Sequence, residues 1–139
     1  KDEAASKRVR FSIRSDEHEL LVATRGSSLT AALENILRNG IKYSPADGRV
    51  SVDIRHSGDQ CHIQVTDSGD GVPESELQAI FRPFYRTDEA RSRESGGFGL
   101  GLAIAQRTVA QHNGTIEAFN TRGAGLTIRI KLPCLDTSF

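Results

Sequence analysis

A run of glycines that leads into a helical pattern constrains this chain more than any other feature. Four glycines fall within residues 96–101, and from Leu100 to His112 the apolar residues recur with the period of a helix. Free N–H groups and the positive end of the dipole make such a helix start an anion site. The spacing is neither the G-x-G-x-x-G of dinucleotide-binding folds nor a P-loop. The run therefore predicts phosphate binding on another fold, with a flexible hinge as the weaker alternative.

Length, charge and composition exclude several classes of protein. A chain of 139 residues predicts one domain, residues 1–139. Its 18 basic and 18 acidic residues cancel, which argues against a nucleic-acid partner. No apolar run reaches the roughly 18 residues of a membrane span, and two cysteines are too few for a disulfide framework or a zinc site. The opening residues 1–3 look like a cut made inside a longer protein.

The hydrophobic pattern predicts the fold class. Strands are expected at 8–14, 20–23, 50–54, 61–65, 116–119 and 126–132, and helices at 29–42, 74–81 and 100–112, with a long loop at 82–98. Hairpins outnumber crossovers in this order. We therefore expect an α/β two-layer sandwich in which three helices cover one face of a mixed, mostly antiparallel sheet. A loop as long as 82–98 is usually functional in a compact domain.

The first predicted helix carries two asparagines on one ridge. Asn35 and Asn39 lie four residues apart, within a polar sector of about 140° that also holds Glu34, Arg38 and Lys42. Asparagine is a poor residue for a helix interior, but its amide oxygen is a suitable ligand for Mg²⁺. A solvated face with two incidental asparagines is the alternative, and the helix taken alone slightly favours that alternative.

An aspartate ends one of the central strands. Asp67 shares its parity with Ile63 and Val65, so it is expected to face the core, where a carboxylate needs a donor. The loop that follows reads Asp-x-Gly-x-Gly over residues 67–71, and such glycines let a flat ligand approach the main chain. The exocyclic amine of a purine is a fitting donor. The alternative is that Asp67 caps backbone N–H groups, and the motif taken alone favours that alternative.

The loop 82–98 holds the arginines Arg82, Arg86, Arg91 and Arg93. Arginines suit phosphoryl transfer because they hold and neutralise charge on the transferring group. A solvated loop of mixed charge is the alternative, and we favour a phosphate role for Arg86 but not for Arg91.

Taken in order, these segments resemble the catalytic, ATP-binding domain of bacterial sensor histidine kinases, which belongs to the group that includes gyrase, Hsp90 and MutL. The family's N box resembles residues 34–45, its first glycine box 67–73, its F box 81–86 and its second glycine box 97–102. The motif core spans 29–133, with 82–98 as the lid, and four ordered motifs make the resemblance specific. The run 81–91 is similar to kinases of the Cpx type. The resemblance implies a Bergerat-type ATP-binding fold.

The resemblance also implies how a nucleotide would bind. Asp67 would accept the adenine amine, and Tyr43 would lie against the ring. Other residues implied at the base or its surroundings are Gly69, Gly71, Val72, Ile80, Phe84 and Thr127. Asn39, with Asn35 beside it, would ligate the Mg²⁺ that bridges the phosphates. The phosphates would contact Lys42, Gly97, Gly99, Leu100, Gly101 and Leu102.

Two residues have implied catalytic roles. Arg86 would reach the γ-phosphate, and Glu34 matches the glutamate that activates water in the ATPase relatives. Three positions depart from the family's pattern: Gly40 replaces the usual alanine, Phe98 a threonine near the phosphates, and Leu126 a threonine that often helps the adenine, although Thr127 is adjacent.

The implied function is transfer of the γ-phosphoryl group of Mg-ATP to a histidine on a separate helical dimerisation and phosphoacceptor domain. None of the four histidines here, at 18, 56, 62 and 112, lies in an acceptor motif. Implied partners are that domain and a cognate response regulator. The implied location is a cytoplasmic domain of an inner-membrane sensor kinase, with no direct membrane contact. A nucleotide-gated binding module, or an ATPase that uses Glu34, remains the alternative.

Overall fold

The computed structural model describes residues 10–15, 28–85, 101–121 and 125–133. Its strands are β1 (Arg10–Ser15), β2 (Arg49–Ser57), β3 (Gln60–Thr66), β4 (Thr115–Asn120) and β5 (Leu126–Pro133). Its helices are α2 (Ser28–Tyr43) and α4 (Gly101–Gln111), with the 3-10 turns η1 (Glu74–Glu76) and η2 (Ala79–Phe81). The expected strand at 20–23 and the lid residues 86–98 lie outside the described residues.

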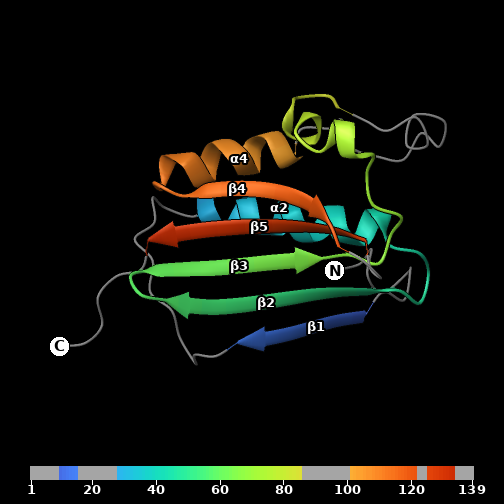
Figure 1. Cartoon of the computed structure of the whole chain (residues 1–139), viewed down its shortest axis with the longest axis horizontal. Coiled ribbons are helices and arrows are strands. Elements are labelled where there is room, and N and C mark those ends of the chain that lie inside the picture. The colour runs from blue at the N-terminus through green and yellow to red at the C-terminus, as the bar shows by residue number, and fades with distance from the viewer. Residues whose placement is uncertain (1–9, 16–27, 86–100, 122–124, 134–139) are drawn as a thin grey trace.

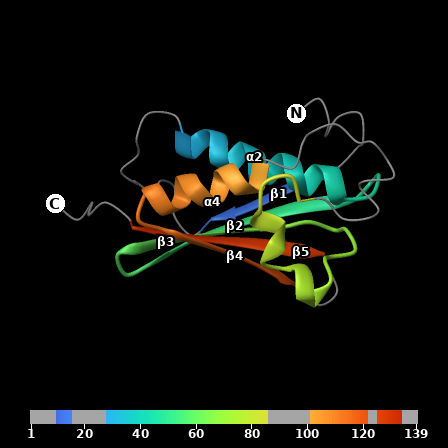
Figure 2. The ribbon, with the colours of Figure 1, turned by 90° about the horizontal axis from the view of Figure 1, so that it is seen from above.

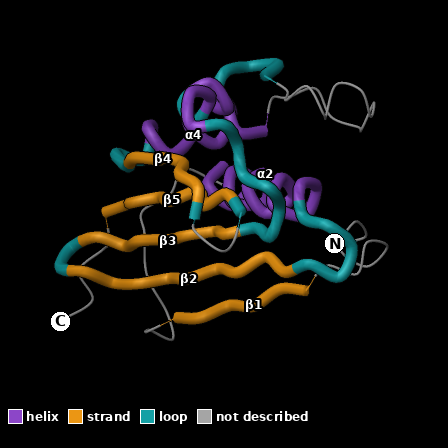
Figure 3. The backbone as a smooth tube through the Cα atoms, turned by 45° about the vertical axis from the view of Figure 1, so that its right-hand side comes forward, coloured by secondary structure: helices purple, strands orange, loops and turns teal. Residues whose placement is uncertain are grey.

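The strands form one sheet in the order β1-β2-β3-β5-β4 (Figures 1 and 3). β1 pairs with β2 in parallel, because the chain crosses over through α2 between them, and the other three pairings are antiparallel. The expected mixed, mostly antiparallel sheet is confirmed.

The two α-helices lie side by side on one face of this sheet (Figure 2). The core between the layers comes from the apolar side of α2, from α4 and from alternate residues of the central strands. Its most completely buried members are Ala32, Ile36, Val50, Ala105, Val109, Ile130 and Leu132. Small residues on both helices allow their backbones to approach each other closely. The expected two-layer α/β sandwich is therefore confirmed.

The third expected helix, 74–81, is present as two 3-10 turns. Each turn is closed by a bond to the third preceding residue, from the Leu77 N–H to the Glu74 carbonyl and from the Arg82 N–H to the Ala79 carbonyl. So short a segment gains few helical hydrogen bonds to offset nucleation. Its fold is decided by burial of Ile80 and Phe81 instead.

The long helices end close to where the sequence predicts. α2 extends one residue beyond the expected 29–42 at each end, and α4 is one residue shorter at each end than the expected 100–112. After α4, the left-handed residue is Asn113, with a φ of 63°. Neither of these helices is long and apolar enough to cross a membrane.

Candidate functional site

Three of the four sequence motifs meet beside α2. A Cβ placed on Gly101, the first residue of α4, would lie 3.6 Å from the Cβ of Asn35. A Cβ on Gly40 would lie 3.8 Å from that of Asp67, and Gly69 lies so close to the carbonyl oxygen of Tyr43 that no larger residue fits. The asparagine ridge, the aspartate loop and the start of α4 are therefore neighbours in space.

Asp67 lies at the centre of this arrangement. Its side chain is only 5% exposed, on the helix side of the sheet as the parity argument predicts. Oδ1 accepts hydrogen bonds from the N–H of Gly69, at 2.9 Å, and from the N–H of Leu126, at 3.0 Å. The capping weighed as the alternative is thus present, but it uses one oxygen. No donor within the described residues bonds Oδ2.

Burial raises the pKa of Asp67. Loss of water around the carboxyl raises its pKa above the ordinary value of 3.8, and the two backbone N–H donors partly oppose that rise. A ligand that donates a hydrogen bond to Oδ2 would stabilise the ionised form further. The carboxyl is therefore arranged to accept a donor from a ligand at low desolvation cost.

Side chains that the sequence analysis missed hold the loop after Asp67. The Ser44 hydroxyl accepts from the Ser68 N–H at 3.1 Å, and the Ser68 hydroxyl accepts from the Arg49 N–H at 2.8 Å. Farther along, the Asn120 amide bonds both the N–H and the carbonyl of Val72. Ser44 directly follows the N-box helix, which is a usable signal, but no local pattern marks Asn120.

The side chains along the polar ridge of α2 differ in their exposure to solvent. Glu34 and Arg38 are exposed, whereas Asn35, Asn39 and Lys42 are half-buried. The ammonium of Lys42 lies 5.7 Å from the centre of the Tyr43 ring. The two asparagines thus lie at the boundary between core and solvent, which is where a bound ion would be partly desolvated.

The F-box segment combines buried anchors with an exposed ring. Ile80 and Phe81 are buried, and Val72 packs against the same core. Phe84 is 67% exposed and has a φ of 66°, while the Tyr85 hydroxyl donates to the Glu76 carboxylate. Leu102 of the second glycine box is buried in the core. The positions of Arg86, Gly97, Gly99 and Leu100 lie outside the described residues.

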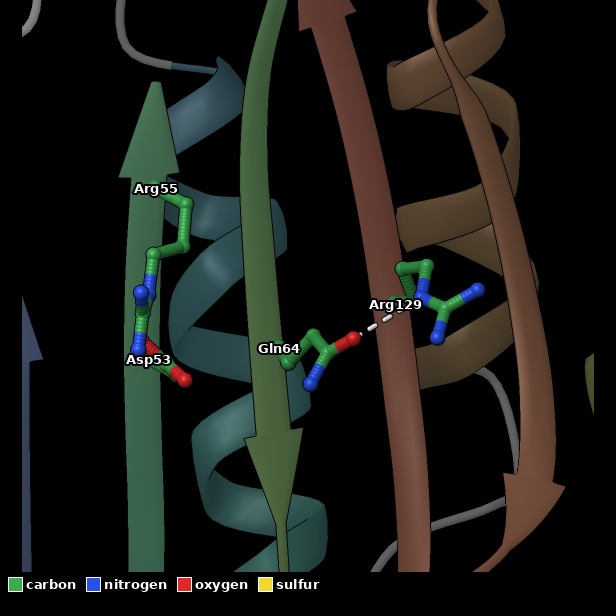
Figure 4. Close-up of polar contacts among 4 residues, drawn as sticks. All are labelled: Asp53, Arg55, Gln64 and Arg129. Carbon is green, nitrogen blue, oxygen red and sulfur yellow. Dashed lines mark hydrogen bonds and ion pairs between the residues drawn. The ribbon is translucent and has the colours of Figure 1, made fainter. Parts of the chain in front are cut away.

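The structure does not bring Thr127 to this site. Thr127 points to the sheet face away from the helices, where its hydroxyl bonds those of Thr66, at 2.7 Å, and Thr121. Because side chains alternate along β5, Leu126 takes the helix side instead, and the nucleotide contact expected of Thr127 stays a prediction. Figure 4 shows Arg129, two residues farther along β5, bonded to Gln64 on that outer face.

Mixed polar contacts cover the outer face of the sheet. Arg129 also pairs with Glu117 at 3.0 Å and lies over the Phe119 ring. Arg55 pairs with Asp53 at 2.9 Å (Figure 4). These partly exposed pairs stabilise the fold little. Thus the motif residues lie on the helix side of the sheet, and partly exposed charged side chains lie on the other side.

Comparison with known proteins gives one consistent picture. Residues 24–136 match the family model described as histidine kinase-, DNA gyrase B- and HSP90-like ATPase. Over 112 residues the chain is 47% identical to the sensor histidine kinase CpxA of Escherichia coli (strain K12), an alignment that covers 81% of this chain and 24% of CpxA. The chain thus spans about a quarter of the length of this curated relative.

Solved structures agree with the sequence relatives. The mycobacterial sensor histidine kinase MprB superimposes with a TM-score of 0.81 at 28% identity, over 94% of this chain and 86% of that one. Full-length ShkA, solved in complex with AMPPNP, superimposes with a TM-score of 0.82 at 24% identity, over 99% of this chain and 28% of that one. The ShkA likeness concerns the fold alone.

Proposed function

Because this chain belongs to the histidine kinase-, DNA gyrase B- and HSP90-like ATPase family, we propose that it binds Mg-ATP and supplies the γ-phosphoryl group to a histidine on a separate dimerisation and phosphoacceptor domain of a sensor kinase. Residues 1–139 would act as one catalytic domain with residues 82–98 as its lid. The observation that carries the proposal is the meeting of Asn35, the start of α4 and the open oxygen of Asp67 on one side of the sheet.

The adenine would bind at Asp67. Oδ2 would accept the exocyclic amine, since Oδ1 is already held by two backbone donors. Val72 and Ile80 would supply apolar contacts to the base, since both pack in the same core. Gly69 and Gly71 would let the loop fold closely against Tyr43 and Asn120 beside the base. Tyr43 would lie against the ring. This arrangement selects adenine over guanine, because guanine presents a carbonyl oxygen where adenine has its amine.

The phosphates and their metal would lie between α2 and α4. Asn39 and Asn35 fit Mg²⁺, because they offer neutral amide oxygens at a half-buried boundary and leave most of the coordination to water and phosphate. When bound, Mg²⁺ neutralises charge on the phosphate oxygens. Lys42 would add a cation, and the free N–H groups at the start of α4 would meet phosphate oxygens. Gly97, Gly99, Leu100, Gly101 and Leu102 complete this proposed set.

The transfer step needs positioning more than covalent chemistry. A ring nitrogen of the acceptor histidine attacks the γ-phosphorus, the bond to the β,γ-bridging oxygen breaks, and ADP leaves. Arg86 would neutralise charge on the transferring group, and Glu34, exposed at the start of the asparagine ridge, would orient the attacking group. Phe84, whose ring is largely exposed, would contact the nucleotide from the root of the lid.

A kinase of this kind would have two partners and a defined location. The helical dimerisation domain would donate the acceptor histidine, and a cognate response regulator would receive the phosphoryl group from it. The domain would lie on the cytoplasmic side of an inner-membrane sensor kinase without touching the bilayer itself.

The test is reconstitution of transfer. The chain, its purified helical dimerisation domain, Mg²⁺ and γ-labelled ATP are mixed, and we expect an acid-labile phosphoprotein to accumulate. Arg86→Ala should reduce transfer far more than it reduces ADP affinity. Absence of label while ATP binds would contradict the transfer proposal. Steady phosphate release by the domain alone, lost in Glu34→Gln, would instead favour an ATPase.

A further inference from the structure

Asn120, on the edge strand β4, makes two hydrogen bonds to the main chain of the glycine loop. It is the last residue of β4, and its Oδ1 accepts from the Val72 N–H at 2.9 Å while its Nδ2 donates to the Val72 carbonyl at 2.7 Å. Nδ2 also donates to the Glu74 carboxylate at 3.1 Å. The amide therefore satisfies both main-chain groups of Val72, as a paired strand would.

The same side chain shapes the residue before Val72. Gly71 has a φ of 79°, a conformation that strains any residue with a Cβ, and the Asn120 amide oxygen occupies the space that a Cβ would need. Asn120 thus limits both where the loop lies and which residue can stand at 71. Only an amide matches this pair of contacts, because a carboxylate has no donor for the Val72 carbonyl.

The register links this contact to Asp67. Asn120 pairs across the sheet with Leu126, and the Leu126 N–H is one of the two donors to Oδ1 of Asp67. One row of the sheet therefore ties down both ends of the loop 67–72. These bonds therefore fix the distance between Asp67, expected to accept the adenine amine, and Val72, expected beside the base.

From these contacts we propose that Asn120 is a positioning residue for the nucleotide base. It acts through Val72 and Gly71, without touching the nucleotide, by holding the loop at the width that an adenine needs in order to reach Asp67. The inference rests on the proposed function, and it adds a determinant of base selectivity outside the four motifs.

The test uses Asn120→Asp, which keeps the shape of the side chain but replaces the donor with a second acceptor. The full chain is titrated calorimetrically with ATP and with GTP in the presence of Mg²⁺. We expect ATP affinity to fall about tenfold, the scale of one unsatisfied polar group at this partly buried contact. The ratio of ATP affinity to GTP affinity should also fall, and a purely structural role would not change that ratio in the molecules that remain folded.

Two further variants complete the design. Asn113→Asp makes the same chemical change at an exposed asparagine after α4 and should keep the wild-type ratio. Asn120→Ser is the milder variant, and it decides the question if Asn120→Asp fails to fold. A folded Asn120→Ser with the wild-type ATP-to-GTP ratio would overturn the proposal. Failure of the wild-type chain to bind ATP would overturn the proposed function instead.

Discussion

Asp67 combines a structural role in the fold with a proposed role in binding. Its Oδ1 joins the glycine loop to the start of β5 through the N–H groups of Gly69 and Leu126, which lie far apart in sequence. Gly125 lies so close to this carboxyl that a side chain there would collide with it. Because only one oxygen is used in the fold, the structural role and the proposed adenine contact do not compete.

The raised pKa of Asp67 has a consequence for stability. The folded state holds this proton to a higher pH than the unfolded chain, whose carboxyl titrates near 3.8. The contribution of Asp67 is therefore complete below that value and declines as pH rises through the raised pKa. We expect the difference in unfolding free energy, wild type minus Asp67→Asn, to decrease with pH across this window.

Urea unfolding of both proteins at a series of pH values from about 4 to about 7 measures this difference directly. A difference that stays constant or increases over that range would contradict the assigned direction. Bound ATP should favour the ionised form of Asp67, because its amine donates a hydrogen bond to the carboxylate. The wild type should therefore bind ATP more tightly as pH rises through the raised pKa, whereas Asp67→Asn should show no such trend.

At the scale of the element, α2 has one face that packs in the core and another that is proposed to bind the metal. Leu29, Ala32 and Ile36 are buried against the sheet and α4, while Asn35 and Asn39 lie half-buried at the boundary. The helix tolerates these asparagines because the apolar side supplies most of its stability. Gly40 has room for the alanine of the family's pattern, since its Cβ would lie 3.4 Å from Val50, an ordinary contact.

Because Asn39 lies on the polar face of α2, its amide can be removed to test the proposed Mg²⁺ site. Asn39→Ala should remove most of the gain in ATP affinity that Mg²⁺ provides, because the amide oxygen is the proposed ligand. The unfolding free energy should change by no more than about 1 kcal/mol, since the site is only half-buried. Calorimetric titration of ATP with and without Mg²⁺ measures the gain.

Thr30→Ala, at an exposed position in the first turn of the same helix, is the matched control and should keep the full Mg²⁺ effect. An Asn39→Ala protein whose ATP affinity still rises with Mg²⁺ as in the wild type would remove Asn39 from the metal site.

At the scale of the whole molecule, the candidate site lies at the interface between the helix layer and the sheet. α2, the loop after β3 and the start of α4 each contribute to it, and the sheet holds their relative positions through β3, β5 and β4. A ligand that spans this interface would bind only the folded chain. Its binding energy would therefore add to the stability of the entire domain.

Mg-ATP should accordingly raise the free energy of unfolding by about 2.7 kcal/mol at one hundred times its dissociation constant. Thermal unfolding with increasing Mg-ATP should show a rising midpoint, and the rise should be smaller in Asp67→Asn at equal nucleotide concentration. A midpoint that does not move at nucleotide concentrations far above the calorimetric dissociation constant would contradict binding at the native interface.

The amino-acid sequence by itself determined the alternating strands, the two amphipathic helices, the order of the motifs and the core-facing side of Asp67. These are local properties, because side-chain period and glycine content depend on neighbours within a few residues. Tertiary structure alone decided that 74–81 folds as 3-10 turns and that Ser44 and Asn120 hold the glycine loop. Each of these depends on contacts between residues distant in the chain, whose partners become neighbours only once the sheet and its register have formed.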